Sequence, residues 1–408
     1  MRFLKRLLKW ILILFGLLII TLYVFDYDYI IKAVRTIYAK GHTTSYLSDY
    51  NVFDNRTIKK GTAQPWNFHK HYNTVKETEV LTNLNNDKGT VAYLIIKNDS
   101  IWFENYYDSY NKDSKSNSFS MAKSMISAML GKAIMEGKIK SLDQLVSDFY
   151  PEFKEGLADK LTVGDLSSMA SGLNWDENYY SPLSIMTRAY FYDDLEKMML
   201  GVKVTEVPGQ SYKYLSGNTQ LLGMVIEKAT SVKLSDYLSD SFWRPLGAEN
   251  EAFWQLDSEE SGLEKTFCCV ASNARDFARF GKLYKQYGKW NGKQLLDSAF
   301  IAKSITPRFT ASPEYGYGWW LAKHNNKDIF YMRGHLGQMV IVIPQDNVII
   351  VRLGHRIEIP KDMSKDPHSP NFYTYIDEAY KMMGSKSLNN KRFLQITPDN
   401  YRNGNSEK

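Results

Sequence analysis

Apolar residues are concentrated near the start of the chain, where they form one uninterrupted run. From Trp10 to Phe25 nearly every residue is hydrophobic. With the two preceding leucines the run has about 18 residues, or roughly 27 Å of helix, which is enough to span a bilayer. Four cations precede the run, aromatic residues follow it, and no small-residue cleavage site ends it. The pattern predicts an uncleaved transmembrane anchor over residues 1–25.

The hydrophobic pattern changes twice after this segment. Residues 26–88 are polar and rich in tyrosine with weak periodicity, so we expect a connector with some helix. From Thr90, two β-rich runs surround the polar residues 97–100, which is typical of a β-hairpin. From about Ser120, apolar residues recur at helical spacing until Gly137, which predicts a central, mostly buried helix.

The remaining chain alternates between a helical block and a second set of strands. Residues 138 to about 300 have mainly helical periodicity, and β-rich runs return near Tyr315 and continue to about residue 354. A helix is expected at 371–384, and residues 391–408 form a polar tail. This order predicts an α+β fold over residues 89–390. Its antiparallel sheet is built from N- and C-terminal segments and flanked by helices, with an inserted all-helical lobe at about 138–300.

Charge and cysteine content narrow the function classes. The chain has 51 basic and 45 acidic residues, a net charge of +6, and part of the basic excess lies at the two ends. Because no basic stripe interleaved with aromatic residues occurs between them, nucleic-acid binding is not expected. The two cysteines, Cys268 and Cys269, are adjacent, so we expect buried hydrophobic side chains and no disulfide. Nothing in the sequence indicates the oligomeric state.

The stretch "FSMAKS" (119–124) is the strongest candidate for chemistry. Ser120 opens the most apolar helix, and Lys123 follows one turn later on the same face. A serine at a helix N-terminus has free backbone N–H groups to stabilise an oxyanion, and a buried lysine can accept its proton. The other interpretation is a helix cap followed by a solvated cation. The two roles of Ser120 are compatible.

This stretch resembles the first motif of the serine β-lactamase and penicillin-binding-protein superfamily. Further stretches are similar, in order, to the class C-like and esterase-like branch: "LTVGDLSSMASGLNW" (161–175), "VPGQSYKYLSGNTQLLGMVIEKAT" (207–230), "WRPLGAENEAFWQLD" (243–257), "TFCCVASNARDFARFGKL" (266–283) and "RGHLGQMVIVIPQDNVIIV" (333–351). The pattern is most similar to 6-aminohexanoate-dimer hydrolase and related carboxylesterases, which also open with S-M-A-K.

The resemblance implies roles for particular residues. Ser120 is expected to be the acylated nucleophile, Lys123 its proton partner and Tyr214 a second general acid/base, with Tyr212 as the alternative tyrosine. Ser216 occupies a substrate-binding position that is asparagine in many relatives, and Asn218 is a partial substitute for that amide. Tyr179, or its neighbour Tyr180, is expected to line the pocket.

The third motif of the family, usually Lys-Thr/Ser-Gly, corresponds here to His335-Leu336-Gly337. Without the lysine there is no fixed cation in the motif to pair with a substrate carboxylate, which argues against an efficient β-lactamase or DD-peptidase. His335 is expected at the rim of the pocket, and Gly337 is expected to let the strand edge approach the substrate. The backbone N–H groups of Ser120 and Gln338 would form the oxyanion hole. The adjacent acids Asp176 and Glu177 are interpreted as solvated charges.

The expected function is therefore an exported, membrane-anchored serine hydrolase that cleaves an ester or amide of a small molecule through an acyl-enzyme. We expect no metal ion and no organic cofactor. The expected location is the bacterial inner membrane, single-pass, with the catalytic domain on the periplasmic side. The alternatives are a β-lactamase or D-amino-acid peptidase of the same fold, and a catalytically weak penicillin-recognising or cell-wall-binding protein.

Overall fold

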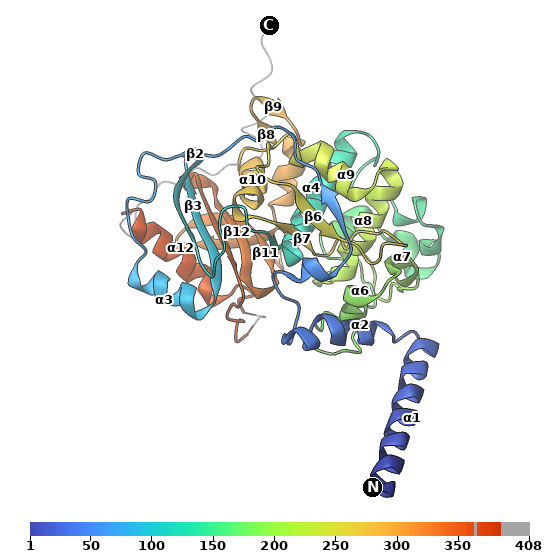
Figure 1. Ribbon diagram of the computed structural model, residues 1–408. Helices are drawn as coiled ribbons and strands as arrows, with labels where there is room; N and C mark the ends of the chain where they lie inside the picture. The colour runs from blue at the N-terminus through green and yellow to red at the C-terminus, as the bar shows by residue number, and fades with distance from the viewer. Residues whose placement is uncertain (363–364, 385–408) are drawn as a thin grey trace.

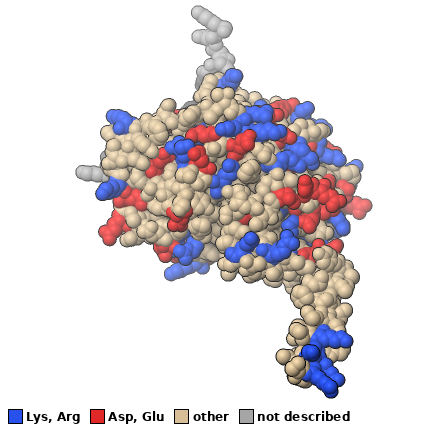
Figure 2. Space-filling view, in the orientation of Figure 1, with Lys and Arg blue, Asp and Glu red and all other residues tan. Residues whose placement is uncertain are grey.

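A single long helix projects from the body of the protein (Figure 1). The computed structural model describes residues 1–362 and 365–384, so the predicted tail at 391–408 lies outside the described residues. Helix α1 (Arg2–Val24) has no buried residue, and by length and composition it is apolar enough to cross a membrane. A signal sequence near the N-terminus can have the same length and composition. Its basic residues lie at the free end, away from the body (Figure 2).

The main sheet has seven strands in the order β10-β11-β12-β13-β3-β4-β2. Its strands are β2 (Asn67–Phe68), β3 (Thr90–Lys97), β4 (Ser100–Tyr106), β10 (Trp320–His324), β11 (Lys327–Gly334), β12 (Gln338–Ile343) and β13 (Val348–Gly354). The hairpin of β3 and β4 pairs antiparallel with β13, so the C-terminal strands close directly onto the N-terminal hairpin. The predicted α+β class and the sheet built from both ends of the domain are confirmed.

The central strands are apolar on both faces because helices cover both. Ala92, Leu94 and Ile96 of β3 belong to one core cluster, together with residues of α4 (Ala122–Met135) and α10 (Ala274–Lys285). The alternate residues Tyr93 and Ile95 belong to a second cluster, together with residues of α12 (Pro370–Met382) and α3 (Glu79–Asp87). Successive side chains of a strand point to opposite faces, so a strand covered on both sides appears as a nearly continuous hydrophobic run.

A mainly helical lobe lies beside the sheet (Figure 1). Its helices are α5 (Val163–Ser167), α6 (Ile185–Phe191), α7 (Leu195–Leu200), α8 (Ser216–Thr230) and α9 (Leu234–Leu238), followed by α10 and α11 (Ser298–Ser304). The lobe expected to be all-helical also contains strands. These are β6 (Ala252–Gln255), β7 (Val270–Ser272) and the short hairpin β8 (Lys289–Trp290) and β9 (Lys293–Gln294). Strand β6 pairs with a strand far away in the sequence, β1 (Asn55–Ile58), which local periodicity cannot reveal.

Residues 26–88, expected to be a connector, contribute to the folded core. Helix α2 (Tyr29–Thr36) follows α1, β1 joins β6, β7 and β5 (Ser116–Asn117) in a four-stranded sheet, and β2 extends the main sheet. Asp49 is fully buried and accepts hydrogen bonds from Asn117 Nδ2 (2.8 Å), Gln255 Nε2 (3.0 Å) and the hydroxyl of Tyr190. This segment therefore supports the strand that leads to Ser120.

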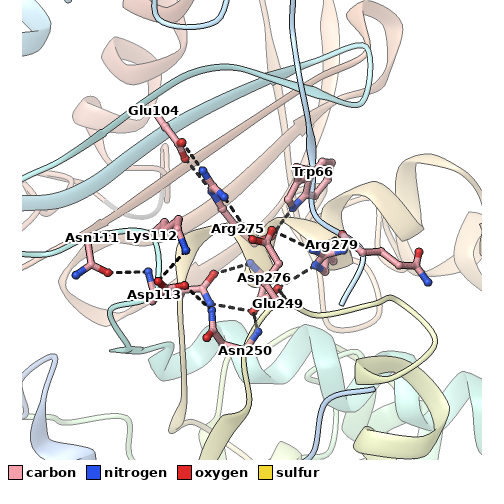
Figure 3. Close-up of polar contacts among 12 residues, drawn as sticks. Trp66, Glu104, Asn111, Lys112, Asp113, Glu249, Asn250, Arg275, Asp276 and Arg279 are labelled. Atoms are coloured by element: carbon pink, nitrogen blue, oxygen red, sulfur yellow. Dashed lines mark hydrogen bonds and ion pairs between the residues drawn. The ribbon is translucent and has the colours of Figure 1, made fainter. Parts of the chain in front are cut away.

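A buried ion-pair network joins the main sheet to α10 (Figure 3). Arg275 donates to both carboxylate oxygens of Glu104 on β4, at 2.9 and 2.5 Å, and a further N–H reaches Glu249 at 3.3 Å. Arg279 pairs with Glu249 at 3.2 Å and with Asp276 at 2.9 Å. Because every charge shown here has a partner of opposite sign, the network fixes α10 against the sheet without an unpaired buried ion.

Lys265 is a buried lysine that forms no ion pair with any of the described residues. Its side chain is fully enclosed, and its ammonium lies 3.8 Å from the ring centroid of Phe53 and 5.3 Å from that of Tyr190. No hydrogen-bond partner for Nζ occurs among the described residues. Burial, together with the charge of Lys32, lowers the pKa of Lys265 to about 7.

Replacing Lys265 with methionine is expected to raise the free energy of unfolding by about 1 to 4 kcal/mol, because an unpaired buried cation is exchanged for an apolar side chain. The folded-state pKa lies below the unfolded value. The unfolded chain therefore binds more protons between pH 7 and 10, and the stability of the wild type rises with pH there. The variant should lose part of this rise.

Thermal unfolding at pH 7 and 9 measures both effects, with the exposed Lys138→Met as control. A variant less stable than wild type at both pH values would contradict the prediction.

The two cysteines differ from expectation in one respect. Cys268 and Cys269 are buried, as predicted, but the structure joins these neighbours in a disulfide. Cys269 takes a left-handed backbone conformation, with φ 81°.

Candidate active site

The segment before Ser120 is held in an unusual conformation by its neighbours. Phe119 has a φ of 45°, which a non-glycine residue rarely takes, and its backbone N–H donates to Asn117 Oδ1 at 2.8 Å. The backbone N–H of Asn117 in turn donates to the carbonyl of Leu47, also at 2.8 Å. A short 3-10 turn (Phe119–Met121) then leads into α4, which places the partly exposed Ser120 at the N-terminal end of this helix. Backbone strain of this kind is typical of functional sites.

Lys123 lies one turn along, and its ammonium has three close neighbours. Nζ lies 2.9 Å from Ser120 Oγ, 3.1 Å from Ser216 Oγ and 2.7 Å from the carbonyl oxygen of Phe267. Burial lowers the pKa of Lys123 from 10.5 to about 8, and the carboxylate of Glu177 opposes part of this shift. A substantial fraction of Lys123 is therefore neutral near pH 8 and able to accept the proton of Ser120.

Tyr214, rather than Tyr212, lies beside this pair. The ring centroid of Tyr214 is 5.2 Å from Lys123 Nζ, and the ring packs against Trp320 at 5.3 Å. Burial and the charge of Glu177 raise the pKa of Tyr214, while a hydrogen bond with Ser120 offsets part of the rise. Tyr212 packs against Tyr315 instead. Because Tyr214 keeps its proton at neutral pH, it is suited to donate a proton to a leaving group.

Glu177, which sequence analysis interpreted as a solvated charge, lies inside the site. Its carboxylate accepts hydrogen bonds from Ser216 N (2.7 Å), Ser216 Oγ (2.5 Å), Trp175 Nε1 (3.1 Å) and the hydroxyl of Tyr179 (2.5 Å). Ser216 is fully buried between Glu177 and Lys123. Asn218, the expected partial substitute for a substrate-binding amide, is bonded to Ser171 instead.

His335 and Tyr179 form one wall beside the nucleophile. Their rings stack at 5.5 Å with an interplanar angle of 15°, and His335 also meets the ring of Phe119 edge-on at 5.5 Å. Burial lowers the pKa of His335 to about 4, so its imidazole is neutral at physiological pH and supplies no cation. Tyr180, the other tyrosine considered for the pocket, is 65% exposed.

The turn after β11 places the two glycines of this region in different surroundings. A Cβ on Gly334 would lie 2.2 Å from the carbonyl oxygen of Ser118, so the strand passes closest to the nucleophile segment there. A Cβ on Gly337 would instead meet the guanidinium of Arg352 at 2.6 Å. Arg352 donates to the carbonyls of Leu336 (2.8 Å) and Gly337 (3.0 Å). The strand therefore approaches the nucleophile segment at Gly334, and the expected approach of Gly337 to the substrate stays a prediction.

Gln338 begins strand β12, and its side chain is committed to the neighbouring strand. Its amide exchanges hydrogen bonds with the backbone of Gly354, at 2.7 and 2.9 Å, and donates to the carbonyl of His335 at 3.0 Å. Gln338 is the register partner of Gly334 across the turn. The expected participation of its backbone N–H in an oxyanion hole stays a prediction.

Arg333 adds a cation that sequence analysis did not single out. It lies on β11, two residues before His335, and its guanidinium carbon is 4.6 Å from the ring centroid of Trp320. One N–H of its guanidinium donates to the carbonyl of Pro367 at 2.8 Å. The positive charge of Arg333 offsets part of the rise in the pKa of Tyr214. In the sequence, Arg333 is marked only by its position directly before Gly334.

A model of the Beta-lactamase family matches residues 78–369. The chain belongs to this family. The match contains Ser120, Lys123, Tyr214 and the β11–β12 turn.

Individual relatives within this family are distant. The 6-aminohexanoate-dimer hydrolase of Paenarthrobacter ureafaciens is 23% identical over 287 residues, which cover 65% of this chain and 72% of the relative. A solved structure from Bacillus anthracis, assigned as a 6-aminohexanoate-dimer hydrolase, has a TM-score of 0.67 and 21% identity and covers 83% of this chain and 94% of its own. A family VIII carboxylesterase has a TM-score of 0.58 and 17% identity and covers 74% of this chain and 95% of its own. At these identities the structural likeness supports the fold.

Proposed function

We propose that this protein is a membrane-anchored serine hydrolase that cleaves an ester or a simple amide through an acyl-enzyme on Ser120. The observation that carries the proposal is the contact of Ser120 Oγ with a buried lysine amine whose pKa is lowered to about 8, beside a tyrosine that stays protonated. A helix cap followed by a solvated cation needs no such burial. Relatives of this chain include proteins named as a hydrolase and a carboxylesterase, which is consistent with this reaction class.

Acylation begins when neutral Lys123 accepts the proton of Ser120 as Oγ attacks the substrate carbonyl. The carbonyl oxygen takes up the negative charge, and the new ammonium is held by the carbonyl of Phe267 and the hydroxyl of Ser216. Tyr214 then donates its proton to the leaving group and recovers one from Lys123. Deacylation runs these steps in reverse: water attacks the acyl carbonyl carbon as its proton passes through Tyr214 to Lys123, and Ser120 Oγ leaves and takes a proton back from Lys123.

The developing oxyanion needs backbone donors. Ser120 N, at the N-terminal end of α4, is one. For the second, Gln338 N is the predicted donor, and His335 N is the alternative that the close approach of Gly334 to Ser118 favours. Tyr179 and His335 would form the wall that contacts the substrate, with Ser216 behind Lys123.

The proposed location is a bacterial inner membrane, with α1 crossing it once and the catalytic domain on the periplasmic side. Three features support this. Helix α1 is apolar and exposed along its length, its cations lie at its free end, and the folded body follows within a few residues. Positive residues are retained on the cytoplasmic side of a span, so the body would be exported.

The alternative is a β-lactamase or D-amino-acid peptidase of the same fold, or a catalytically weak penicillin-recognising protein. The neutral His335 disfavours carboxylate recognition at the third motif. Arg333 is the observation in its favour, because a guanidinium can pair with a substrate carboxylate.

A three-probe assay tests the proposal on the detergent-solubilised full chain. The wild type should hydrolyse p-nitrophenyl butyrate and be labelled by a fluorophosphonate, whereas Ser120→Ala should do neither. Ser124→Ala, one turn away with its hydroxyl bonded to Gly318, is the matched control for loss of a serine. Absence of turnover and labelling in the wild type would refute the hydrolase. Nitrocefin turnover without esterase activity would favour the alternative.

A further inference from the structure

Glu177 has no part in the proton transfers described above, yet its carboxylate is held by several hydrogen bonds inside the site. It follows the buried Trp175 in the loop before α6, and four donors converge on its carboxylate. Two of these donors belong to one residue, Ser216, whose hydroxyl is also 3.1 Å from Lys123 Nζ. The contacts therefore run from Glu177 through Ser216 and Lys123 to Ser120.

The donor and acceptor of each hydrogen bond from Glu177 to Lys123 follow from the number of protons that each group carries. A carboxylate only accepts, so the single proton of the Ser216 hydroxyl points to Glu177. The Ser216 oxygen can then only accept from Lys123. The carbonyl of Phe267, 2.7 Å from Nζ, also only accepts.

A neutral lysine amine has two N–H groups and one lone pair. If both N–H groups are taken by Ser216 Oγ and the carbonyl of Phe267, the lone pair is left for the third neighbour, Ser120, at 2.9 Å. Neutral Lys123 is then oriented as a base for the nucleophile. Without the carboxylate, Ser216 could turn its proton to Lys123 and draw the lone pair away from Ser120.

We propose that Glu177 is a positioning residue that acts through Ser216 to direct the lone pair of neutral Lys123 at the hydroxyl of Ser120. The inference rests on the proposed hydrolase function and deepens it. In the acylation step the Ser120 O–H bond breaks, its proton passes to Lys123 Nζ, and the oxygen forms a bond to the substrate carbonyl carbon, whose oxygen takes the electron pair. Ser216 and Glu177 keep their own protonation states throughout.

Other titratable and charged groups near these hydrogen bonds do not take over the role of the Glu177 carboxylate. Tyr179 and Tyr214 are its titratable neighbours, and the pKa values of both are raised by burial and by the carboxylate, so both phenols remain neutral. His335, stacked on Tyr179, is neutral, and the guanidinium of Arg333 lies over the ring of Trp320.

Two variants separate this role from a purely electrostatic one. Glu177→Gln removes the charge that raises the pKa of Lys123, so the acidic limb of the pH–rate profile moves to lower pH. A purely electrostatic role would leave the plateau above that limb unchanged. Our proposal expects the plateau rate to fall about ten- to a hundredfold. The N–H of the glutamine amide can donate to Ser216 Oγ, and the hydroxyl proton of Ser216 would then point to Lys123. Ser216→Ala keeps the charge and the other contacts of Glu177, and it should lower the plateau similarly without moving the limb.

The readout is the rate of fluorophosphonate labelling of the detergent-solubilised full chain between pH 5 and 10. Ser216→Thr restores a hydroxyl and should recover most of the rate, and Asp176→Asn, an exposed acid next to Glu177, should behave as wild type. A wild-type plateau in either Glu177→Gln or Ser216→Ala would overturn the inference. An unlabelled wild type would instead refute the proposed function, so the two failures are distinguishable.

Discussion

Replacing Lys123 with methionine is expected to lower the rate of Ser120 acylation at least about 10³-fold, because the amine in contact with the Ser120 hydroxyl is lost. Methionine has similar length and no charge to desolvate, so the fold should be retained in this fully enclosed position. The kcat/KM for p-nitrophenyl butyrate and the fluorophosphonate labelling rate measure the loss. Lys132→Met, a partly buried lysine in the last turn of the same helix, is the control.

The wild type should show the corresponding pH dependence. Only the unprotonated amine accepts a proton, so kcat/KM should fall about tenfold per pH unit below a pKa near 8 and level off above it. This limb should be absent from the residual activity of Lys123→Met. A wild-type limb above pH 10 would show that Lys123 is not desolvated, and a variant with nearly full activity would show that it is not the base.

Replacing Tyr214 with phenylalanine is expected to slow hydrolysis about 10²-fold or more for substrates with poor leaving groups, such as alkyl esters and anilides. An alkoxide or amide anion must be protonated as it leaves, and the phenylalanine ring keeps the packing against Trp320 but has no proton to give. p-Nitrophenolate is a stable anion, so p-nitrophenyl butyrate should lose much less. The contrast between the two substrate classes is the diagnostic measurement.

Tyr212→Phe is the matched control for this experiment. Tyr212 is two residues away and packs against Tyr315, so its loss should affect both substrate classes equally and weakly. If the larger loss for poor leaving groups occurred in Tyr212→Phe and not in Tyr214→Phe, Tyr212 would be the proton donor and the prediction would be wrong.

The parts of the fold that depend on local pattern could be predicted from the sequence. Polar residues between two apolar runs predicted the hairpin at 97–100, and the structure ends β3 at Lys97 and begins β4 at Ser100. Helical spacing likewise predicted α4 and α12 to within a few residues. In both cases the spacing of apolar residues within one segment shows which of its faces is buried, so no distant partner is needed to predict the element.

The parts that depend on distant partners could not be predicted. Strand β1 exists because it pairs with β6, and β2 because it pairs with β4, so neither has a periodic signal of its own. Glu177 resembled a surface acid because an adjacent acid precedes it, and its partner Ser216 lies 39 residues later. Only the folded structure brings together the donors that make its carboxylate part of the site.

The packing of residues 26–88 also limits where the proposed anchor α1 could be cut from the folded body. Leu47 and Asp49 both hold Asn117, which in turn holds the backbone just before Ser120. A cut after Asp49 would separate both residues from the rest of the folded body together with α1, so a released form that keeps this support has to be cut before Leu47. The stretch between Val24 and Tyr29, where α1 ends and α2 begins, meets this condition and also leaves the packing of α2 intact.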